Sequence, residues 1–313
     1  MKTLITGGAG FIGSHLVDSL MAQEHSVSVY DNLASGKLKN LEKWQDNRRF
    51  SFNHGDLLNP PEVAKAVKDS DVVFHLAANP EVDAKKASPM DHFQQNITAT
   101  YNLLEAVREA GCVERLAFTS SSTVYGEAEV YPTPEEYGPL IPISLYGASK
   151  LACEALISAY SSMYGFRSAI FRLANVVGPR TYHGVIHDFV DKLRKTPEML
   201  EVLGDGSQSK SYLYVSDCIE GIMKGMVSGK QVAIYNIGTE DQVSVLDIAE
   251  IVKEETGCSD AVIRLTGGVD GGRGWRGDVK KMLLDTQRLL DTGWAPKYTS
   301  SEAVRLTARS LAG

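Results

Sequence analysis

The sequence predicts an α/β fold, in which a doubly wound parallel sheet is accompanied by a smaller C-terminal domain. Short runs that are apolar throughout alternate with longer amphipathic stretches, as in successive β-α-β units. Strands that are apolar on both faces indicate a sheet that is covered by helices on both sides. With 313 residues, the chain is also long enough for about two domains.

The elements of the first half follow from this alternation. Apolar runs predict strands at residues 3–6, 26–30, 50–53, 72–77, 116–119 and 168–173. The amphipathic stretches between these runs predict helices at residues 12–22, 61–68, 91–110 and 145–164. Strands that are joined by helices in this way pair in parallel through right-handed crossovers.

After residue 173 the alternation becomes less regular. Strands are expected at residues 213–215, 233–237 and 262–265, and helices near residues 217–227, 245–255 and 286–290. We therefore predict one domain at residues 1–172 and a second at 173–313, with segments of the second returning to the first sheet. The glycines between residues 267 and 274 predict a loop that a bound ligand would order, because glycine loses the most backbone entropy on ordering.

Composition and charge exclude several classes of protein. The chain has 32 lysine and arginine residues against 39 aspartate and glutamate residues, so it lacks the basic surface of a nucleic-acid binder. We see no apolar stretch near the ~20 residues that span a bilayer, and no signal segment before the first strand. The cysteines form no CxxC pair, which is typical of a reducing compartment. We expect a soluble cytoplasmic protein without nucleic-acid or membrane partners.

A glycine cluster joins the first expected strand to the first expected helix. It satisfies G-x-G-x-x-G at Gly8, Gly10 and Gly13, and G-x-x-G-x-x-G at Gly7, Gly10 and Gly13. Such a loop turns tightly and brings bare backbone against a pyrophosphate, which the N-terminus of the helix attracts. Ordinary turns use glycine too, but the position between strand and helix favours a dinucleotide site in a Rossmann-type sheet.

Asp31 ends the second expected strand, 18 residues after Gly13. An acidic residue at this place accepts hydrogen bonds from the adenosine ribose and repels the 2′-phosphate of NADP. No arginine occurs in the ten residues that follow Asp31. The pattern therefore favours NAD as the cofactor, and an ordinary acidic turn at Asp31-Asn32 is the alternative.

Tyr146 and Lys150 form a candidate catalytic pair. They are four positions apart in the helix expected at 145–164, so both side chains lie on one helical face. A free tyrosine has a pKa of about 10, and a general base near neutrality needs a pKa roughly three units lower. Because burial raises the pKa of a tyrosine, positive charge from Lys150 and the nicotinamide ring of NAD⁺ must lower it.

A hydroxyl-rich segment follows the strand expected at 116–119. Residues 119–126 read Thr-Ser-Ser-Ser-Thr-Val-Tyr-Gly. Loops at the carboxyl ends of parallel strands line the ligand crevice, where a hydroxyl can hydrogen-bond a substrate alcohol. An ordinary polar turn is the alternative, and the Tyr146–Lys150 pair favours the catalytic interpretation.

Together these residues resemble the extended short-chain dehydrogenase/reductase family, and within it the UDP-glucose 4-epimerases and related nucleotide-sugar enzymes. The resemblance extends over essentially the whole chain and includes residues 6–13, 55–57, 75–78, 120–126, 146–150 and 204–217. It implies catalytic roles for Ser121, Tyr146 and Lys150, with Thr123 beside them. It also implies NAD contacts at Gly7, Gly10, Phe11, Ile12, Gly13, Asp31, Asn32, Ser35, Gly36, Asp56, Leu57, Leu76, Ala77, Ala78, Asn96, Thr119, Tyr146 and Lys150.

The resemblance also indicates which reaction to expect. Related 4,6-dehydratases and decarboxylases carry an acidic residue just before the Val-Tyr-Gly triplet, where this chain has Ser122 and Thr123. Epimerisation needs one base and a reversible hydride acceptor, so we expect exchange of UDP-glucose and UDP-galactose through a 4-keto sugar. The alternatives are an epimerase for UDP-N-acetylhexosamine or UDP-glucuronate, a related reductase, and an NAD-sensing regulator. Regulators of this kind typically lose the tyrosine or the lysine.

Contacts to the UDP-sugar are implied mainly in the second half, at Ser121, Asn175, Val185, Ile186, Val202, Lys210, Arg273, Arg276 and Met282. Lys210 stands where many relatives have an arginine for the diphosphate, and a lysine loses the bidentate fork. Either Arg273 or Arg276 could be the second cation on the diphosphate. Met282 takes the place of a residue that limits the hexose 2-substituent, and a flexible methionine admits either size.

Two further expectations concern partners and metals. The helices at 91–110 and 145–164 carry more apolar surface than one face of a sheet requires. In relatives such helices form a four-helix bundle across a homodimer, although packing on the sheet alone is the alternative. His183 and His187 are four residues apart but lack a third ligand, so we expect no metal. His75 is expected as a core or crevice residue.

Overall fold

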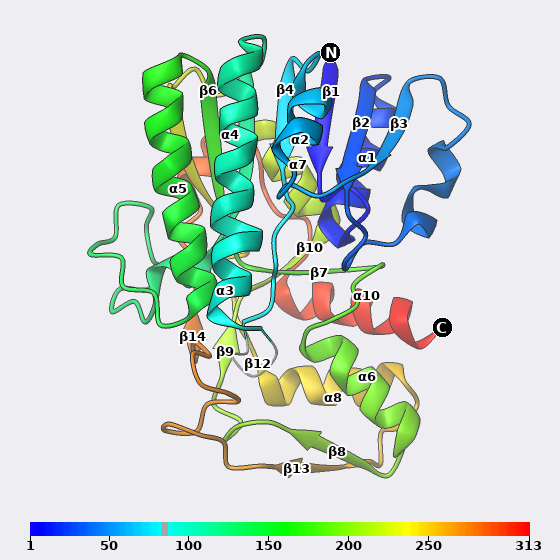
Figure 1. Ribbon diagram of the computed structural model, residues 1–313. Coiled ribbons are helices and arrows are strands. Elements are labelled where there is room, and N and C mark those ends of the chain that lie inside the picture. Colours follow the sequence, from blue (N-terminus) through cyan, green and yellow to red (C-terminus); the bar gives the residue numbers. More distant parts are fainter. Residues whose placement is uncertain (83–86) are drawn as a thin grey trace.

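A seven-stranded sheet forms the centre of the computed structural model, which describes residues 1–82 and 87–313 (Figure 1). The strands lie in the order β11-β6-β5-β4-β1-β2-β3, and all neighbouring strands are parallel. Their bounds are β1 Lys2–Thr6, β2 Ser26–Asp31, β3 Phe50–His54, β4 Val72–His75, β5 Arg115–Ser121, β6 Arg167–Leu173 and β11 Val232–Ile237. The predicted doubly wound parallel sheet is confirmed.

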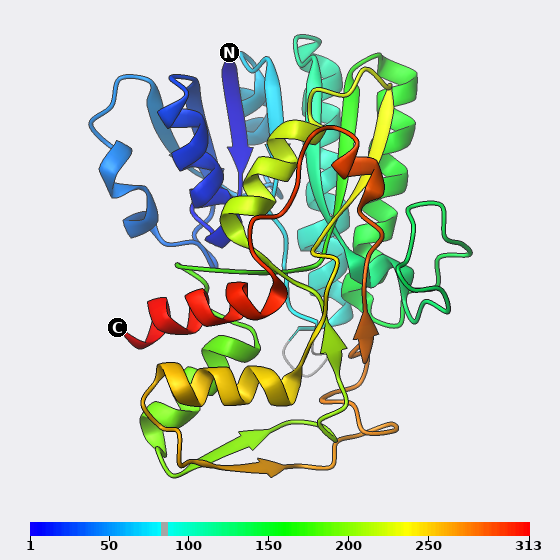
Figure 2. The same ribbon diagram turned by 180° about the vertical axis from the view of Figure 1, so that it is seen from behind.

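Helices cover both faces of this sheet (Figures 1 and 2). On one side lie α2 (Pro60–Val67), α4 (Ala99–Ala110) and α5 (Leu145–Tyr164), and on the other α1 (Phe11–Ala22) and α7 (Val215–Gly225). Each face has its own apolar core. Leu4 packs in the α4–α5 core and its neighbour Ile5 in the α1–α7 core, because successive strand residues point to opposite faces.

Much of the chain after β6 forms a second group of elements at the carboxyl ends of the strands (Figure 2). Helices α6 (Val185–Lys195), α8 (Val245–Glu255) and α10 (Ser300–Ala312) share a third core with the parallel pair β8 (Met199–Val202) and β13 (Val262–Leu265). The smaller elements are β7 (Asn175–Val177), β9 (Ser209–Lys210), β10 (Tyr212–Tyr214), β12 (Val243–Ser244), β14 (Lys281–Met282) and α9 (Gln287–Leu290). The division at residue 172 remains a prediction, and β11 of the second half pairs with β6.

The helix predicted at 91–110 is interrupted. It consists of α3 (Pro89–His92), the π-helical segment η2 (Phe93–Thr98) and α4. In η2 the side chain of Asn96 turns to the loop after β4, where it accepts the backbone N–H of Asn79 at 2.7 Å. Short π-helical segments of this kind are frequent at functional sites. The interruption therefore brings the side chain of Asn96 to the loop after β4.

Three other differences concern bounds and missed elements. The strand predicted at 72–77 ends at His75, because the chain turns into the crevice after it. Helices α6 and α10 lie outside the elements expected from the sequence, as do the short 3₁₀ helices η1 (Leu38–Trp44) and η3 (Ser122–Tyr125). Within the described ranges 1–82 and 87–313, no helix combines the length and apolarity that crossing a membrane requires.

The crevice follows from the strand order. The chain proceeds from β1 to β2 and β3 in one direction, and from β4 to β5 and β6 in the other. The loops after β1 and β4 therefore diverge, and ligands of such sheets bind at this point. Here the N–H of Leu76 still bonds to the carbonyl of Thr6 at 3.1 Å, and the chain opens immediately beyond.

Candidate active site

The loop between β1 and α1 has the shape of a pyrophosphate cradle. Gly7 has a φ of +73°, and a Cβ at this position would lie 2.6 Å from the backbone nitrogen of Ala77. A Cβ at Gly13 would collide with the carbonyl oxygen of Gly7, so helix and loop approach too closely for any side chain. Gly10, the N-cap of α1, makes no side-chain cap, which leaves the amides of Phe11 and Ile12 to an anion. The loop fits a dinucleotide.

Asp31 holds this cradle in place. One carboxylate oxygen accepts the N–H of Ala9 at 2.9 Å, and the other accepts the N–H of Leu33 at 2.8 Å. Burial raises the pKa of Asp31, and these two hydrogen bonds oppose that rise. The carboxylate thus fixes the glycine loop, and its remaining lone pairs are available to ribose hydroxyls.

We expect Asp31→Ala to weaken NAD binding about 10- to 100-fold, because hydrogen bonds to a charged group contribute about 1.5–3 kcal/mol. Calorimetric titration of NAD into the apoprotein measures this loss. Asp285→Ala is the matched control, since Asp285 caps an ordinary turn by accepting the N–H of Gln287 at 2.9 Å. Equal NAD affinity of the Asp31 and Asp285 variants would show that Asp31 has no contact with the cofactor.

The other expected cofactor residues lie at the same edge of the sheet. Asn32, Ser35 and Gly36 follow β2, Asp56 and Leu57 follow β3, and Leu76, Ala77 and Ala78 follow β4. Asn32 donates to Asp56 at 3.0 Å, which joins the loops after β2 and β3. A Cβ at Gly36 would lie 2.9 Å from that of Ala9, so the loop after β2 covers the glycine loop closely. The structure thus gathers these residues at one edge of the sheet, although their contacts to NAD remain a prediction.

Tyr146 and Ser121 meet where β5 ends. Ser144 caps α5 by accepting the N–H of Gly147 at 3.1 Å, and this start of the helix directs Tyr146 toward the crevice. Burial raises the pKa of Tyr146 to about 12, and a hydrogen bond with Ser121 acts against that rise. Thr123 donates to the Ser121 hydroxyl at 3.0 Å. With a pKa this high, Tyr146 can act as a base only when positive charge lies near it.

Lys150 supplies one such positive charge close to the phenol. Its Nζ lies 5.8 Å from the centre of the Tyr146 ring and donates to the carbonyl oxygen of Thr119 at 2.8 Å. The side chain is only 2% exposed, and this burial lowers the pKa of Lys150 to about 8. The ammonium is therefore held by the strand and charged at neutral pH.

Asn96 connects the cofactor side of the crevice to the catalytic helix. Its amide nitrogen donates to the Ser149 hydroxyl at 2.8 Å, and Ser149 in turn donates to the carbonyl of Tyr146 at 2.7 Å. Its other bonds are to the backbone of Asn79 in the loop after β4. The sequence analysis missed Asn79 and Ser149, since asparagine and serine near a crevice carry no distinctive pattern.

His75 is buried beside this site and is not exposed to the crevice. Its two ring nitrogens lie 2.8 Å from the Thr6 hydroxyl and 2.9 Å from the Thr100 hydroxyl. Burial lowers the pKa of His75 to about 3, so the ring stays neutral. Both nitrogens have partners, so of the two expected positions, core and crevice, the structure shows the core.

The expected diphosphate cations differ in placement. Lys210 donates to Asp278 at 2.7 Å, and Arg273 donates to the carbonyl of the same residue at 2.5 Å and to Glu127. Arg276 instead is 84% exposed and lies 3.4 Å from Asp270. The structure therefore brings Lys210 and Arg273 together and leaves Arg276 in solvent.

The remaining expected substrate residues are mostly buried. Val202 and Ile186 belong to the core beneath α6 and α8, so only their backbones could reach a ligand. Val185 and Asn175 are half-buried, at the first positions of α6 and β7. Met282 packs with Val124 of the turn after β5, which places it near the catalytic segment.

Comparison with known proteins shows the family and agrees with the fold. The family model described as NAD dependent epimerase/dehydratase family matches residues 3–238. The crystal structure of a UDP-galactose 4-epimerase is 45% identical, with a TM-score of 0.88 over 100% of this chain and 99% of that chain. A UDP-glucuronic acid 4-epimerase from Bacillus cereus, in complex with UDP-glucuronic acid and NAD, is 29% identical, with a TM-score of 0.88 over 99% of each chain.

A second activity is represented among the relatives. UDP-glucuronic acid decarboxylase 6 of Arabidopsis thaliana is 34% identical over 98% of this chain and 87% of its own length. Similarity alone therefore leaves several reactions open, while the match to the family model and to NAD-containing structures gives the family and its cofactor. This chain belongs to the NAD-dependent epimerase/dehydratase family, and its cofactor is NAD.

Proposed function

We propose that this protein is a nucleotide-sugar 4-epimerase that interconverts UDP-glucose and UDP-galactose. The observation that carries the proposal is the arrangement of Ser121, Tyr146 and Lys150 at the end of β5, beside the glycine loop. In the segment between Ser121 and Val124 the side chains are hydroxyls, Ser122 and Thr123. The set provides one base with its supporting charge and hydrogen-bond donor, as epimerisation requires.

In this mechanism Tyr146 takes the proton of the sugar 4-hydroxyl and later returns it. Bound NAD supplies a reversible acceptor for the hydride of C4. Ser121 holds the 4-oxygen by a hydrogen bond, and the ammonium of Lys150 favours the ionised form of Tyr146. The 4-keto sugar must turn over before it is reduced on its other face, so the hexose cannot be bound tightly.

The UDP group must therefore anchor the substrate. We propose that Lys210 and Arg273 contact the diphosphate, because the two cations converge on Asp278 at one place in the structure. Arg276 is less suited, since it is 84% exposed. Asn175 and the backbone at Val185, Ile186 and Val202 complete the proposed nucleotide site, and Met282 lies beside the proposed hexose site.

Decarboxylation of UDP-glucuronate and dehydration are the other reactions of the family. Both need a further proton transfer, for which a carboxylic acid is suited. At this place the chain has Thr123, whose hydroxyl donates to Ser121, so the position offers a hydroxyl instead of an acid. Epimerisation of UDP-N-acetylgalactosamine or UDP-glucuronate uses the same three catalytic groups. These substrates are therefore tested in parallel with UDP-galactose.

We expect UDP-galactose to be converted to UDP-glucose by the purified protein with no net formation of NADH. The anomeric proton signals in NMR follow the reaction, with and without added NAD⁺, and UDP-N-acetylgalactosamine and UDP-glucuronate are followed in parallel. Conversion of UDP-glucuronate to a pentose would identify a decarboxylase. If NAD binds but all three sugars stay unchanged, the epimerase proposal is wrong.

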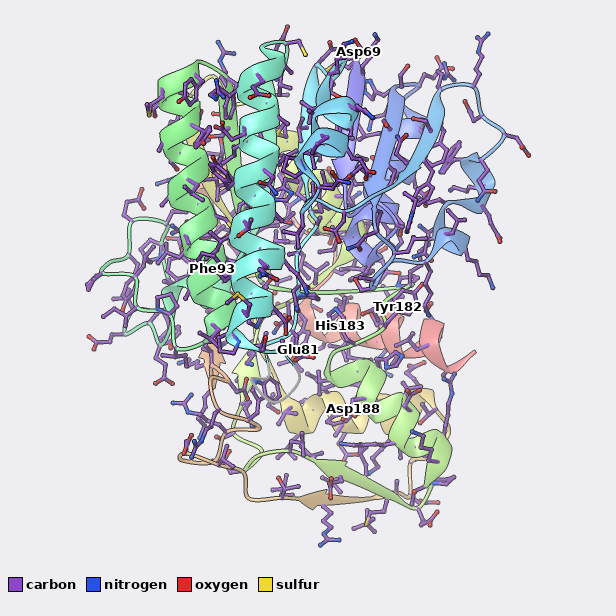
Figure 3. All side chains as sticks on the ribbon, viewed as in Figure 1. Asp69, Glu81, Phe93, Tyr182, His183 and Asp188 are labelled. Atoms are coloured by element: carbon purple, nitrogen blue, oxygen red, sulfur yellow. The ribbon has the colours of Figure 1, made fainter. Side chains whose placement is uncertain are left out.

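We also propose a homodimer through α4 and α5. Their outer face exposes large apolar side chains, among them Tyr101 (45%), Met163 (71%) and Tyr164 (47%). Phe93, which precedes α4, is 56% exposed near the same two helices (Figure 3). Light scattering is expected to give twice the chain mass of 34.1 kDa, and Met163→Glu with Tyr101→Glu is expected to give the single mass. A single mass for the unmodified protein would contradict the dimer.

A further inference from the structure

A buried ion pair lies directly behind the catalytic residues. Arg172 on β6 and Glu154 on α5 are 3% and 4% exposed, and the guanidinium binds the carboxylate through Nη2 at 2.7 Å and through Nε at 3.1 Å. Removing two charges from water costs free energy that their attraction does not reliably return. Such a pair calls for a reason other than stability.

The position of Glu154 suggests that reason. Tyr146, Lys150 and Glu154 are spaced at i, i+4 and i+8, so they lie on one face of α5. Each of the three contacts a different residue at the end of β5. Tyr146 is hydrogen-bonded to Ser121, Lys150 donates to Thr119, and Glu154 accepts the hydroxyl of Ser120.

Arg172 is hydrogen-bonded to the other end of the turn formed by residues 121–125. Its Nη1 donates to the phenol oxygen of Tyr125 at 3.0 Å, and Tyr125 donates to Asn236 on β11 at 2.7 Å. The same Nη1 donates to the carbonyl of Glu135 at 3.1 Å. The segment from Ser121 to Tyr125 is therefore tied at its start through Glu154 and at its end through Arg172.

We propose that Glu154 is a positioning residue for proton transfer by Tyr146, and that its pair with Arg172 fixes both the Ser121–Tyr125 turn and Lys150. Glu154 touches no reacting atom; it acts through Ser120 and Lys150. The proposal rests on the proposed function, because it assigns Glu154 a part in that reaction.

Electrostatics give this role a signature that a purely structural pair would lack. The negative charge of Glu154 raises the pKa of Lys150, against the larger effect of burial. Loss of that charge leaves Arg172 unbalanced nearby, and both changes favour the neutral lysine. Among the residues that the structure describes, the charged and titratable groups around Lys150 are Tyr146, Cys153 and Glu154 on its own helix, His75 on β4 and Arg172 on β6.

Glu154→Gln is the first test, because it removes the charge and keeps the size. We expect kcat to fall about 10- to 100-fold, as for small misplacements of catalytic groups, with KM and NAD content nearly unchanged. The fall of kcat at alkaline pH should begin at least about half a pH unit lower than in the unmodified enzyme. A normal kcat with an unchanged pH profile would overturn the proposal.

Glu255→Gln is the matched control. Glu255 on α8 is 11% exposed and binds Arg305 and Arg309 of α10 at 2.8 and 3.0 Å. Helices α8 and α10 belong to the third core, outside the sheet that contains β5. We expect this variant to lose thermal stability while kcat and its pH profile stay unchanged. If the two glutamate variants behave alike, the role of Glu154 is structural only.

A second variant covers the possibility that Glu154→Gln does not fold. Glu154→Gln with Arg172→Met removes both charges, so no unpaired charge is buried. We expect this protein to fold and bind NAD but to retain the reduced kcat, because the bonds to Ser120 and Tyr125 are altered or absent. Turnover equal to that of the unmodified enzyme would overturn the proposal.

A measurement without substrate separates this inference from the proposed function. Trace acetylation of Lys150 by acetic anhydride, followed by mass spectrometry, reports the neutral fraction of its amine against pH. We expect the midpoint to move to lower pH in Glu154→Gln and to stay in place in Glu255→Gln. If no sugar is epimerised but this shift occurs, the proposed reaction fails while the coupling of Glu154 to Lys150 stands. An unchanged midpoint contradicts the coupling in any case.

Discussion

Tyr146→Phe is expected to lower the turnover of UDP-galactose by about 10²–10⁴-fold, the usual contribution of a positioned general base. The variant loses one oxygen at the end of β5 and leaves the helix start at Ser144 intact. Burial raises the pKa of Tyr146 to about 12, so the phenol depends on Lys150 and bound NAD⁺ for its ionisation. Initial rates followed by NMR provide the measurement.

The control for this change is Tyr160→Phe. Tyr160 lies on the same helix, and its hydroxyl bonds to Glu105 at 2.6 Å away from the crevice. We expect normal turnover from this variant and normal NAD content from both. If Tyr146→Phe keeps more than about a tenth of the turnover, the base is a different group, because loss of a true base costs more.

Local patterns in the sequence were sufficient to predict where the glycine loop and Asp31 lie in the fold. The glycine loop and Asp31 are each tied to the end of one strand, so their place follows once the strands are recognised. The pair Tyr146 and Lys150 needed only helical spacing. In each case residues that are close in the chain carry the prediction, and the parallel sheet then brings the separate pieces to one edge.

Contacts between distant segments could not be predicted in this way. Glu154 and Arg172 are 18 residues apart on different elements, and Lys210 and Asp278 are 68 apart. A glutamate on a helix is ordinarily solvated, although its position eight residues after Tyr146 places it on the catalytic face. Only the packing of α5 on β5 and β6 shows that this carboxylate is buried.

Two helices were missed for a different reason. The buried face of α10 is built largely from small residues such as Ala303, Thr307 and Ala308, which give a weak hydrophobic period. Helix α6 has a regular apolar face, but Val185 and Ile186 were expected only as substrate contacts and no helix was predicted there. The side chain of Ile186 packs in the core, where a substrate contact had been expected.

Activity and stability oppose each other at Lys150. Lys150→Met is expected to lower turnover by about 10²-fold or more, because the ionised Tyr146 loses the ammonium group that lies 5.8 Å from the centre of its ring. The same substitution should not destabilise the fold at pH 7. Burial lowers the pKa of Lys150 from 10.5 to about 8, so holding its charge costs the folded state about 3 kcal/mol. In the variant the carbonyl of Thr119 loses its hydrogen-bond donor, and this loss offsets about 1–3 kcal/mol of the stability gained by removing the buried charge.

The control for this change is Lys253→Met. Lys253 is also buried, on α8, but its Nζ bonds to Glu250 at 2.9 Å, so we expect this variant to lose stability. Comparison of the two lysines separates the cost of a buried unpaired charge from the general effect of removing a long side chain. Urea denaturation of both variants and of the unmodified protein gives the free energies of unfolding.

The pH dependence of stability gives the sharper test. Between about pH 8 and 10.5 the unfolded chain keeps the proton of Lys150 while the folded protein has released it, so the free energy of unfolding rises with pH across this window. Lys150→Met lacks this contribution, and its advantage over the unmodified protein, up to about 2 kcal/mol at pH 7, should shrink as the pH approaches 10.5. A variant that is less stable at pH 7, by a margin that does not change with pH, would mean that Lys150 is not held as a buried cation. Tyr146 would then need another source of positive charge.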